Sequence, residues 1–196
     1  MGDLKAEPIE GGGFMKRVLL MTVCIALLTG CATTQMLKPE QPPELAAKPD
    51  SALLVIVRDT FIGGGIVFWN YLDGRFIGET MGKTYFITHV PPGMHYVVAA
   101  TENTGVAHLD FQAGKHYFLR QGVTIGVWRA RTSGFFPMTA AEAHQAISGC
   151  TYTELDSSKT FPDMEPDLYQ QAIEEYHAGV KVNPEGYKEL LEYKGE

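Results

Sequence analysis

The chain has 196 residues, 16 Lys and Arg against 23 Asp and Glu, and a formal net charge of −7. That length suits one domain with appendages, and 45% hydrophobic residues are enough to build a core, which excludes wholesale disorder. The acidic balance argues against a nucleic-acid-binding protein, because such proteins carry a basic patch.

A targeting signal is the first element in chain order. Lys16 and Arg17 precede an apolar run over residues 18–28. A membrane-spanning helix needs about 20 such residues, so this shorter run favours the apolar region of a signal peptide. We therefore interpret residues 1–30 as a signal peptide. An incidental cysteine after an ordinary secretory signal, or a buried core helix, are the alternatives.

The run ends in Leu28-Thr29-Gly30-Cys31, which resembles the lipobox of bacterial lipoproteins. The resemblance implies that signal peptidase recognises Leu28, Thr29 and Gly30 and cleaves before Cys31. Cys31 would then carry a covalent diacylglycerol and an N-acyl chain such as palmitate, and several acyl chains hold a protein firmly on a membrane. In lipoproteins, an aspartate directly after the acylated cysteine resembles a signal for retention in the inner membrane. This chain has Ala32 at that position, which favours the outer membrane. These features predict a lipid-anchored protein of the bacterial cell envelope, on the periplasmic side of the outer membrane.

Residues 1–14 do not fit a signal peptide, because acidic residues and glycines precede a complete signal that begins at Met15. We expect Met15 to be the true start. After Cys31, residues 31–50 contain four prolines, at positions 39, 42, 43 and 49. Proline favours a semi-extended chain, so this segment is predicted to be a lipidated tether that holds the folded part off the bilayer.

Residues 51–150 alternate short apolar runs with Gly and Pro turns, which is typical of an antiparallel β-sandwich. Asp73-Gly74 is a hairpin signal, and Pro92-Gly93 and Ala113-Gly114 are read as further turns between neighbouring strands. The strands predicted, in chain order, cover residues 53–58, 66–71, 75–79, 84–90, 95–100, 106–111, 115–121 and 126–132.

Helices are predicted only after these strands. Thr139 and Glu142 form a capping-box pattern that opens a short helix to about residue 147. Residues 151–196 carry 11 acidic and 4 basic residues, so the negative charge of the chain lies in this acidic helical tail. Pro166 suits a helix start, with Leu168, Ala172, Ile173 and Tyr176 on one face up to Gly179. Asn183-Pro184 suits a second start, with Tyr187, Leu190 and Leu191 on one face. Such short helices need a surface, which is either their own domain or a partner.

Several motifs together resemble an uncharacterised bacterial lipoprotein family, a domain of unknown function. Their order is similar to PEGA-type and carboxypeptidase-regulatory-like β-sandwiches of transthyretin-like fold, which decorate surface proteins and usually lack catalysis. The resemblance covers residues 51–147, implies no catalytic residue and leaves out the tail. The motifs are LLVIVR (53–58), YLDG (71–74), IG (77–78), TYF (84–86), VPPG (90–93) and AGKHYF (113–118).

The histidines do not form a recognisable metal motif. A two-residue loop at Pro92-Gly93 would place His89 and His95 on opposite sheet faces, whereas a three-residue loop would place them on one face. His108 and His116 pose the same ambiguity at the next turn. We predict no metal site and no cofactor. The six histidines are His89, His95, His108, His116, His144 and His177.

Thiol chemistry is limited to one residue in the mature chain. Cys24 would leave with the signal and Cys31 would be acylated, so Cys150 has no cysteine for an internal disulfide. Cys150 is interpreted as buried, as forming an intermolecular disulfide, or as a nucleophile with His144 as a nominal base. The residues 63–65, all glycine, are no phosphate loop, because no Gly-Lys-Ser/Thr follows.

Other candidates are weaker still. Ser133 and Ser148 lack the context of a nucleophile elbow. Phe135-Phe136-Pro137 with Trp128 form either an exposed aromatic contact surface or part of the core. Asp59, Asp73 and Asp110 are interpreted as turn or strand-end residues.

The sequence thus predicts a non-catalytic binding or structural module, anchored to the membrane, with a protein partner in the envelope and no nucleic acid. Its oligomeric state stays open. The alternative is an envelope hydrolase or metal-dependent enzyme that uses Cys150 or the histidines.

Overall fold

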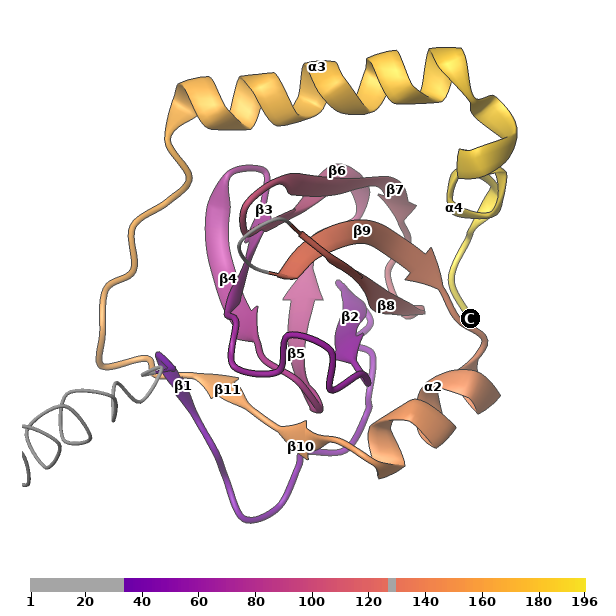
Figure 1. Ribbon diagram of the computed structural model, residues 1–196. Coiled ribbons are helices and arrows are strands. Elements are labelled where there is room, and N and C mark those ends of the chain that lie inside the picture. The colour runs from indigo at the N-terminus through magenta and orange to yellow at the C-terminus, as the bar shows by residue number, and fades with distance from the viewer. Residues whose placement is uncertain (1–33, 127–129) are drawn as a thin grey trace, which may run out of the picture. The chain divides into compact units, whose positions relative to one another are not determined.

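The computed structural model describes residues 34–126 and 130–196. The predicted signal peptide, with Leu28-Thr29-Gly30, and Cys31 therefore lie outside the described residues. Two β-sheets packed face to face dominate the described part (Figure 1). A short helix follows the last long strand, and the tail is helical. The predicted fold class, mainly β with antiparallel sheets, a short helix and a C-terminal helical tail, is confirmed.

The first sheet has five strands in the order β10-β5-β2-β8-β9. Strand β2 is buried along its whole length because it lies in the middle of this sheet and both its faces are covered. It runs parallel to β8, and β10 runs parallel to β5, so this sheet is mixed rather than wholly antiparallel. The strands are β2 (Ala52–Arg58), β5 (Thr84–Val90), β8 (His116–Ile125), β9 (Ala130–Pro137) and β10 (Thr151–Tyr152).

The second sheet is antiparallel, in the order β4-β3-β6-β7. Its β3–β4 hairpin turns at Asp73 and Gly74, with φ of 50° and 83°, as the Asp-Gly pair predicts. Both angles lie in the left-handed region, which Gly and Asp tolerate best. The strands are β3 (Phe68–Leu72), β4 (Arg75–Thr80), β6 (Gly93–Ala100) and β7 (Thr104–Phe111).

Two predicted neighbour pairings are wrong. The Pro92-Gly93 turn connects β5 of the first sheet to β6 of the second, and the Ala113-Gly114 turn connects β7 of the second sheet to β8 of the first. At both places the chain crosses between the sheets instead of forming a hairpin. A local turn signal fixes the change of direction but not the partner of the next strand. The strand β9 ends at Pro137, later than predicted, and Trp128 lies outside the described residues.

Apolar side chains form cores on both faces of the first sheet. Ile56, Phe86 and Leu109 belong to the core between the sheets. Leu53 and Phe118 belong to the other core, which the helix α2 (Ala140–Ser148) covers. The predicted capping box is present at the start of α2.

The acidic tail wraps around the sandwich (Figure 1). Ile173 and Tyr176 of α3 and Leu190 of α4 are buried in the core that contains the second sheet. Both predicted helices exist, but Leu168 and Leu191 are 54% and 43% exposed and do not share the buried face. The tail elements are β11 (Glu154–Leu155), α3 (Pro166–Val182), the 3-10 helix η1 (Pro184–Tyr187) and α4 (Lys188–Glu192).

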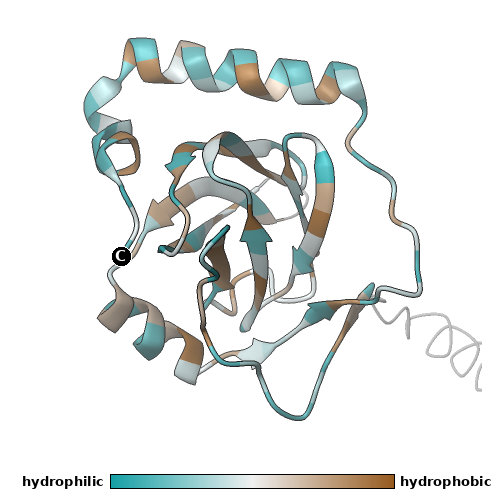
Figure 2. Cartoon of the chain, turned by 180° about the vertical axis from the view of Figure 1, so that it is seen from behind, coloured by the Kyte–Doolittle hydropathy of each residue, from teal (hydrophilic) through white to brown (hydrophobic). Residues whose placement is uncertain are grey.

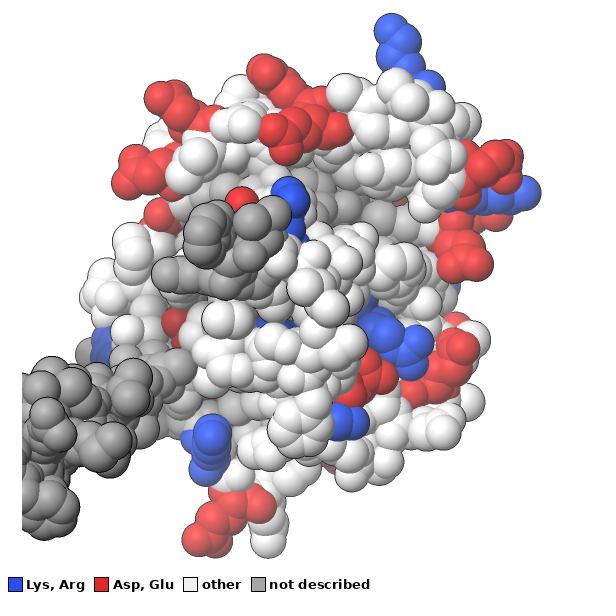
Figure 3. All heavy atoms as spheres, viewed as in Figure 1, with Lys and Arg blue, Asp and Glu red and all other residues white. Residues whose placement is uncertain are grey.

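Along α3, hydrophobic and hydrophilic residues alternate in Figure 2, as an amphipathic helix requires. Figure 3 shows acidic side chains gathered over this helix. The tail therefore turns an apolar stripe toward the sheet and presents most of its carboxylates to solvent. It packs on its own domain, which is the first of the two predicted alternatives.

The end of the tail is fixed to the first sheet. The Tyr193 hydroxyl accepts a hydrogen bond from the Phe118 N–H at 2.9 Å and donates one to the Met138 carbonyl at 3.2 Å. Glu196 and His116 exchange two backbone hydrogen bonds, of 2.8 and 3.0 Å. Residues 51–150 and 151–196 thus belong to one folded unit, which spans Thr34–Glu196.

Candidate functional site: the end of the sandwich at Thr34

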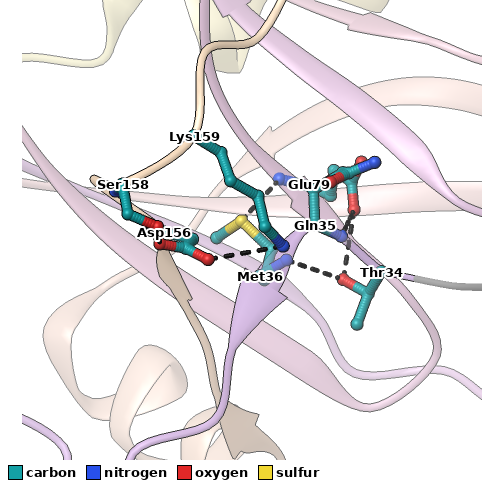
Figure 4. Close-up of polar contacts among 7 residues, drawn as sticks. All are labelled: Thr34, Gln35, Met36, Glu79, Asp156, Ser158 and Lys159. Atoms are coloured by element: carbon teal, nitrogen blue, oxygen red, sulfur yellow. Dashed lines mark hydrogen bonds and ion pairs between the residues drawn. The ribbon is translucent and has the colours of Figure 1, made fainter.

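The described chain begins three positions after Cys31, and it is attached to the sandwich from its first residue. The Thr34 hydroxyl and the Gln35 N–H both donate hydrogen bonds to the Glu79 carboxylate, at 3.1 and 2.9 Å (Figure 4). Glu79 lies on β4 and is only 3% exposed. Two hydrogen bonds to one buried carboxylate fix the start of the segment on the edge of the second sheet.

The strand β1 (Met36–Leu37) continues this attachment by pairing with β11. Met36 is 6% exposed and belongs to the core between the sheets. To its left in the close-up, Asp156 pairs with Lys159 at 3.3 Å and forms the turn that follows β11 (Figure 4). Residues 34–37, where the described part starts, are therefore held between β4 and the beginning of the tail.

The prediction of a free tether over residues 31–50 is wrong for the part that the structure describes. Met36 is buried, and Leu45 and Ala47 pack against the core under α2. These apolar side chains gain more by covering the sandwich than by staying in water, even though the prolines between them favour an extended chain.

A buried arginine organises the loop at the same end of the molecule. Arg58, the last residue of β2, is 0% exposed and donates hydrogen bonds to the carbonyls of Ile66 and Gly63, both at 2.6 Å, and of Ile62, at 3.1 Å. Its guanidinium carbon lies 4.1 Å from the centre of the Phe68 ring. No carboxylate among residues 34–126 and 130–196 forms an ion pair with it.

Burial lowers the pKa of Arg58 to about 10, which still leaves it charged at neutral pH. A buried charge is costly unless hydrogen bonds replace the water it loses. The carbonyls of the loop supply those bonds, so the position of the loop is tied to the position of the charge.

Gly63 and Gly64 allow this loop to lie close to its neighbours. A side chain at Gly63 would collide with Ala130 of β9, and one at Gly82, in the β4–β5 turn, would come within 2.6 Å of the Gly64 Cα atom. The Gly82 N–H donates to the Gly64 carbonyl at 3.0 Å. The sequence shows that 63–65 is no phosphate loop but does not reveal this packing role.

The tip of the loop is apolar and exposed. Phe61 is 75% exposed and Ile62 is 52% exposed. Phe61 and Thr34 line the same cavity, of about 270 Å³, together with Lys38 and Lys83. An apolar tip therefore lies beside the residue at which the chain from Cys31 enters the domain.

Ile125, which is 84% exposed, lies at the same end. It pairs with Ala130, and Gly63 packs against Ala130. Sequence reasoning missed both Arg58 and this apolar tip. The signal that could have found them is an arginine that ends an apolar strand, followed by Phe-Ile and three glycines.

The histidines lie in both sheets and in both helical segments. His89 and His95 lie in different sheets, and so do His108 and His116. The question of whether each pair shares one sheet face no longer arises, because neither turn forms a hairpin. His116 contacts the Leu45 carbonyl at 3.0 Å, and His144 packs near Phe118.

The structure brings His108 and His177 together around Tyr96, which the sequence did not predict. The Tyr96 ring stacks on His108 with 4.0 Å between ring centres, and its hydroxyl is 2.9 Å from His177 Nε2. Burial, and then the neighbouring His177, lower the pKa of His108. This cluster joins α3 to the second sheet.

His95 forms a separate pair with Asp73, with 2.5 Å between Nδ1 and Oδ2. Asp73 also accepts a hydrogen bond from the Tyr96 N–H at 2.9 Å. The pair thereby ties the β3–β4 turn to β6.

Cys150 is half-buried at the end of α2, with its sulfur 4.0 Å from the Arg58 carbonyl. Burial raises the pKa of its thiol, and Lys83 only partly opposes this effect. A raised pKa reduces the thiolate fraction, which is the reactive form. His144 contributes no hydrogen bond to it among the described residues.

A cavity of about 730 Å³ lies between the edge strands β7 and β9 and the tail. Phe136 lines it and is 45% exposed, whereas its neighbour Phe135 is 5% exposed and belongs to the core. One residue of this aromatic pair is therefore in the core and the other is exposed, and a role of Phe136 as a contact surface stays a prediction. Three carboxylates also line the groove, those of Glu175, Glu185 and Glu189.

No group of three or more His, Cys, Asp or Glu side chains within residues 34–126 and 130–196 is arranged to hold a metal ion. In the same ranges no helix is long and apolar enough to cross a membrane.

The comparisons with known proteins yield one relative and no family. No family model matches the chain, and no solved structure matches it. The chain is 28% identical, over 128 residues, to an uncharacterized protein of Haemophilus influenzae, a match that covers 61% of this chain and 76% of that protein. The similarity is too low to place the chain in a family, and the name of the relative carries no function.

Proposed function

We propose that the chain is a lipoprotein of the bacterial cell envelope, anchored through acyl chains on Cys31 to the periplasmic face of the outer membrane. The observation that carries the proposal is the pattern of a basic pair, a short apolar run and Leu28-Thr29-Gly30-Cys31. The attachment of Thr34 to Glu79 supports it, because the folded unit then begins directly after the lipidated residue.

The test is metabolic labelling with a radioactive or clickable palmitate in a Gram-negative host. The Cys31→Ser variant is expected to lose the label and to keep its signal peptide. Cys150→Ser is the matched control and should be labelled like the unmodified chain. Incorporation of label into C31S would refute the lipoprotein assignment. So would the absence of label from the chain without substitutions, together with a Cys31 peptide that has no added mass.

The folded unit itself is proposed to be a non-catalytic module that binds or braces an envelope protein. The groove between β7, β9 and the tail supports this part, since it combines an exposed aromatic side chain, Phe136, with carboxylates. Aromatic residues are enriched at the centres of protein interfaces. Deleting the tail cannot test it, because Ile173, Tyr176 and Leu190 belong to the core.

Photocrosslinking in intact cells provides a test that leaves the fold intact. A crosslinker at position 136 should capture a protein partner, and Glu185→Lys with Glu189→Lys should weaken that capture. The double variant Glu165→Lys with Glu174→Lys is the control, because these exposed tail carboxylates lie outside the groove. Equal capture by both double variants would show that the groove does not recognise the partner.

A further inference from the structure

We infer that the loop tip Phe61-Ile62 inserts into the lipid bilayer as a second membrane contact, beside the acylated Cys31. The inference rests on the proposed lipid anchor. It adds that the sandwich does not hang freely from the anchor but lies on the membrane with one defined end.

The length of chain between the anchor and the domain is the first argument. Thr34 is bound to the buried Glu79, so only the three steps from Cys31 to Thr34 can separate the domain from the bilayer. Fully extended, three residues span at most about 11 Å. Since the acyl chains hold Cys31 at the bilayer surface, Thr34 must stay within that reach of it.

The position of the loop is the second argument. Phe61 lines the same cavity of about 270 Å³ as Thr34, so the apolar tip lies at the end of the molecule that the anchor holds near the lipid. Ile125 belongs to the same end through the packing of Gly63 on Ala130. These three side chains are 75%, 52% and 84% exposed, for Phe61, Ile62 and Ile125 respectively.

The rigidity of the loop is the third argument. Arg58 donates hydrogen bonds to the carbonyls of Ile62, Gly63 and Ile66, and the Gly64 N–H donates to the Phe61 carbonyl at 2.9 Å. Ile62 is therefore held on the surface by a bond from a buried charge, and Phe61 by a backbone bond within the loop. The loop cannot fold back without taking from that charge the three carbonyls that the loop supplies. Exposed large apolar side chains of this kind mark contacts with protein or lipid.

Nearby charges fit a lipid surface. Lys38 and Lys83 line the cavity beside Phe61, and lysines near a bilayer are attracted to anionic head groups. The carboxylate of Glu79, which also lines the cavity, already accepts hydrogen bonds from Thr34 and Gln35.

Depth-dependent fluorescence quenching tests the inference on the full, acylated protein. The variants Phe61→Trp and Ile62→Trp would be purified from membranes and reconstituted into vesicles of phosphatidylethanolamine and phosphatidylglycerol, with or without brominated acyl chains. The unmodified chain gives the background of its native tryptophans. Val182→Trp is the control, because Val182 is at least as exposed as the loop residues, at 86%, but lies at the end of α3 and does not line the cavity beside Phe61.

Brominated lipid is expected to reduce the added emission of F61W and I62W at least twofold, with a blue shift, and to leave V182W unchanged. Unquenched emission of both loop variants, in protein that floats with the vesicles, would overturn the inference while the anchor stands. A blue shift without quenching by bromine would also overturn it, because the tip would then be covered by protein, such as a second copy. If the chain without substitutions does not float with the vesicles, and its Cys31 peptide carries no acyl group, the lipid anchor itself is refuted.

Discussion

Replacing Tyr193 by phenylalanine removes one oxygen atom from the place where the tail is fixed to the first sheet. The hydroxyl lies where β9 ends, and it accepts from the Phe118 N–H and donates to the Met138 carbonyl. It thereby extends the β8–β9 hydrogen-bond ladder by one step. In the variant, both backbone groups lose this partner at a partly buried position.

An unsatisfied buried backbone group costs about 1–3 kcal/mol, so Tyr193→Phe is expected to lower the free energy of unfolding by about 2 kcal/mol. For a domain of this size that change lowers the melting temperature by roughly 4–8 °C. Urea and thermal denaturation, followed by circular dichroism, measure both quantities. Tyr169→Phe is the matched control, because no hydrogen bond of its hydroxyl is present among the described residues.

Alkaline pH gives an independent readout of the same side chain. Burial raises the pKa of Tyr193 to about 12, from an ordinary value of 10. The unfolded chain therefore loses this proton first, so the contribution to stability is complete below pH 10 and is lost as the pH rises toward 12. The variant should show a shallower loss of stability over that window. A melting temperature of Y193F equal to that of Y169F, with parallel pH profiles, would refute the reasoning.

Three further predictions concern single positions. Thr139→Ala should lower the free energy of unfolding by about 1 kcal/mol, because it removes the hydroxyl that caps α2; Thr139→Ser should restore it, and equal stability of all three forms in urea would contradict the role of the cap. Gly74→Ala should cost about 1–2 kcal/mol, since φ at Gly74 is 83°, whereas Gly65→Ala, which meets open space, should cost less in the same denaturation assay. Cys150 should react with iodoacetamide at pH 8 more slowly than free cysteine, because burial raises its pKa, and urea should abolish the difference; equally fast labelling of the folded chain would argue against burial.

The features that the sequence predicted correctly are local ones. The Asp73-Gly74 turn, the capping box at Thr139 and the helix start at Pro166 each depend on a few neighbouring residues whose backbone preferences are strong. At these positions the local preference of the backbone agrees with what the tertiary fold requires, so the local signal persists in the folded chain.

The features that the sequence did not predict depend on distant partners. The pairing of Leu53 with His116 in parallel strands, and the crossing between sheets at Pro92, follow from packing of the whole sandwich. Met36 was assigned to a tether because four prolines follow it within residues 31–50, yet its burial depends on a gap beside Gly78 and Phe86. Composition describes a segment's preference in isolation and cannot show such a gap.

The candidate site divides in the same way. The assignment of Cys31 as the lipid attachment point is a prediction from a contiguous motif, and Cys31 lies outside the described residues. The apolar tip at Phe61 and Ile62 gains its meaning only from the neighbouring Thr34, which no spacing along the chain reveals.

The central place of β2 has a consequence for how the chain reaches its folded state. Its run of Leu53 to Val57 is strongly apolar and β-branched, the composition that assembles into intermolecular β-structure when exposed. One of its neighbours, β8, is made much later in the chain, and proteins with such distant pairings fold slowly, in milliseconds to seconds. During that interval Arg58, charged at the end of the run, acts as a gatekeeper against aggregation, before it becomes the buried charge that holds the loop.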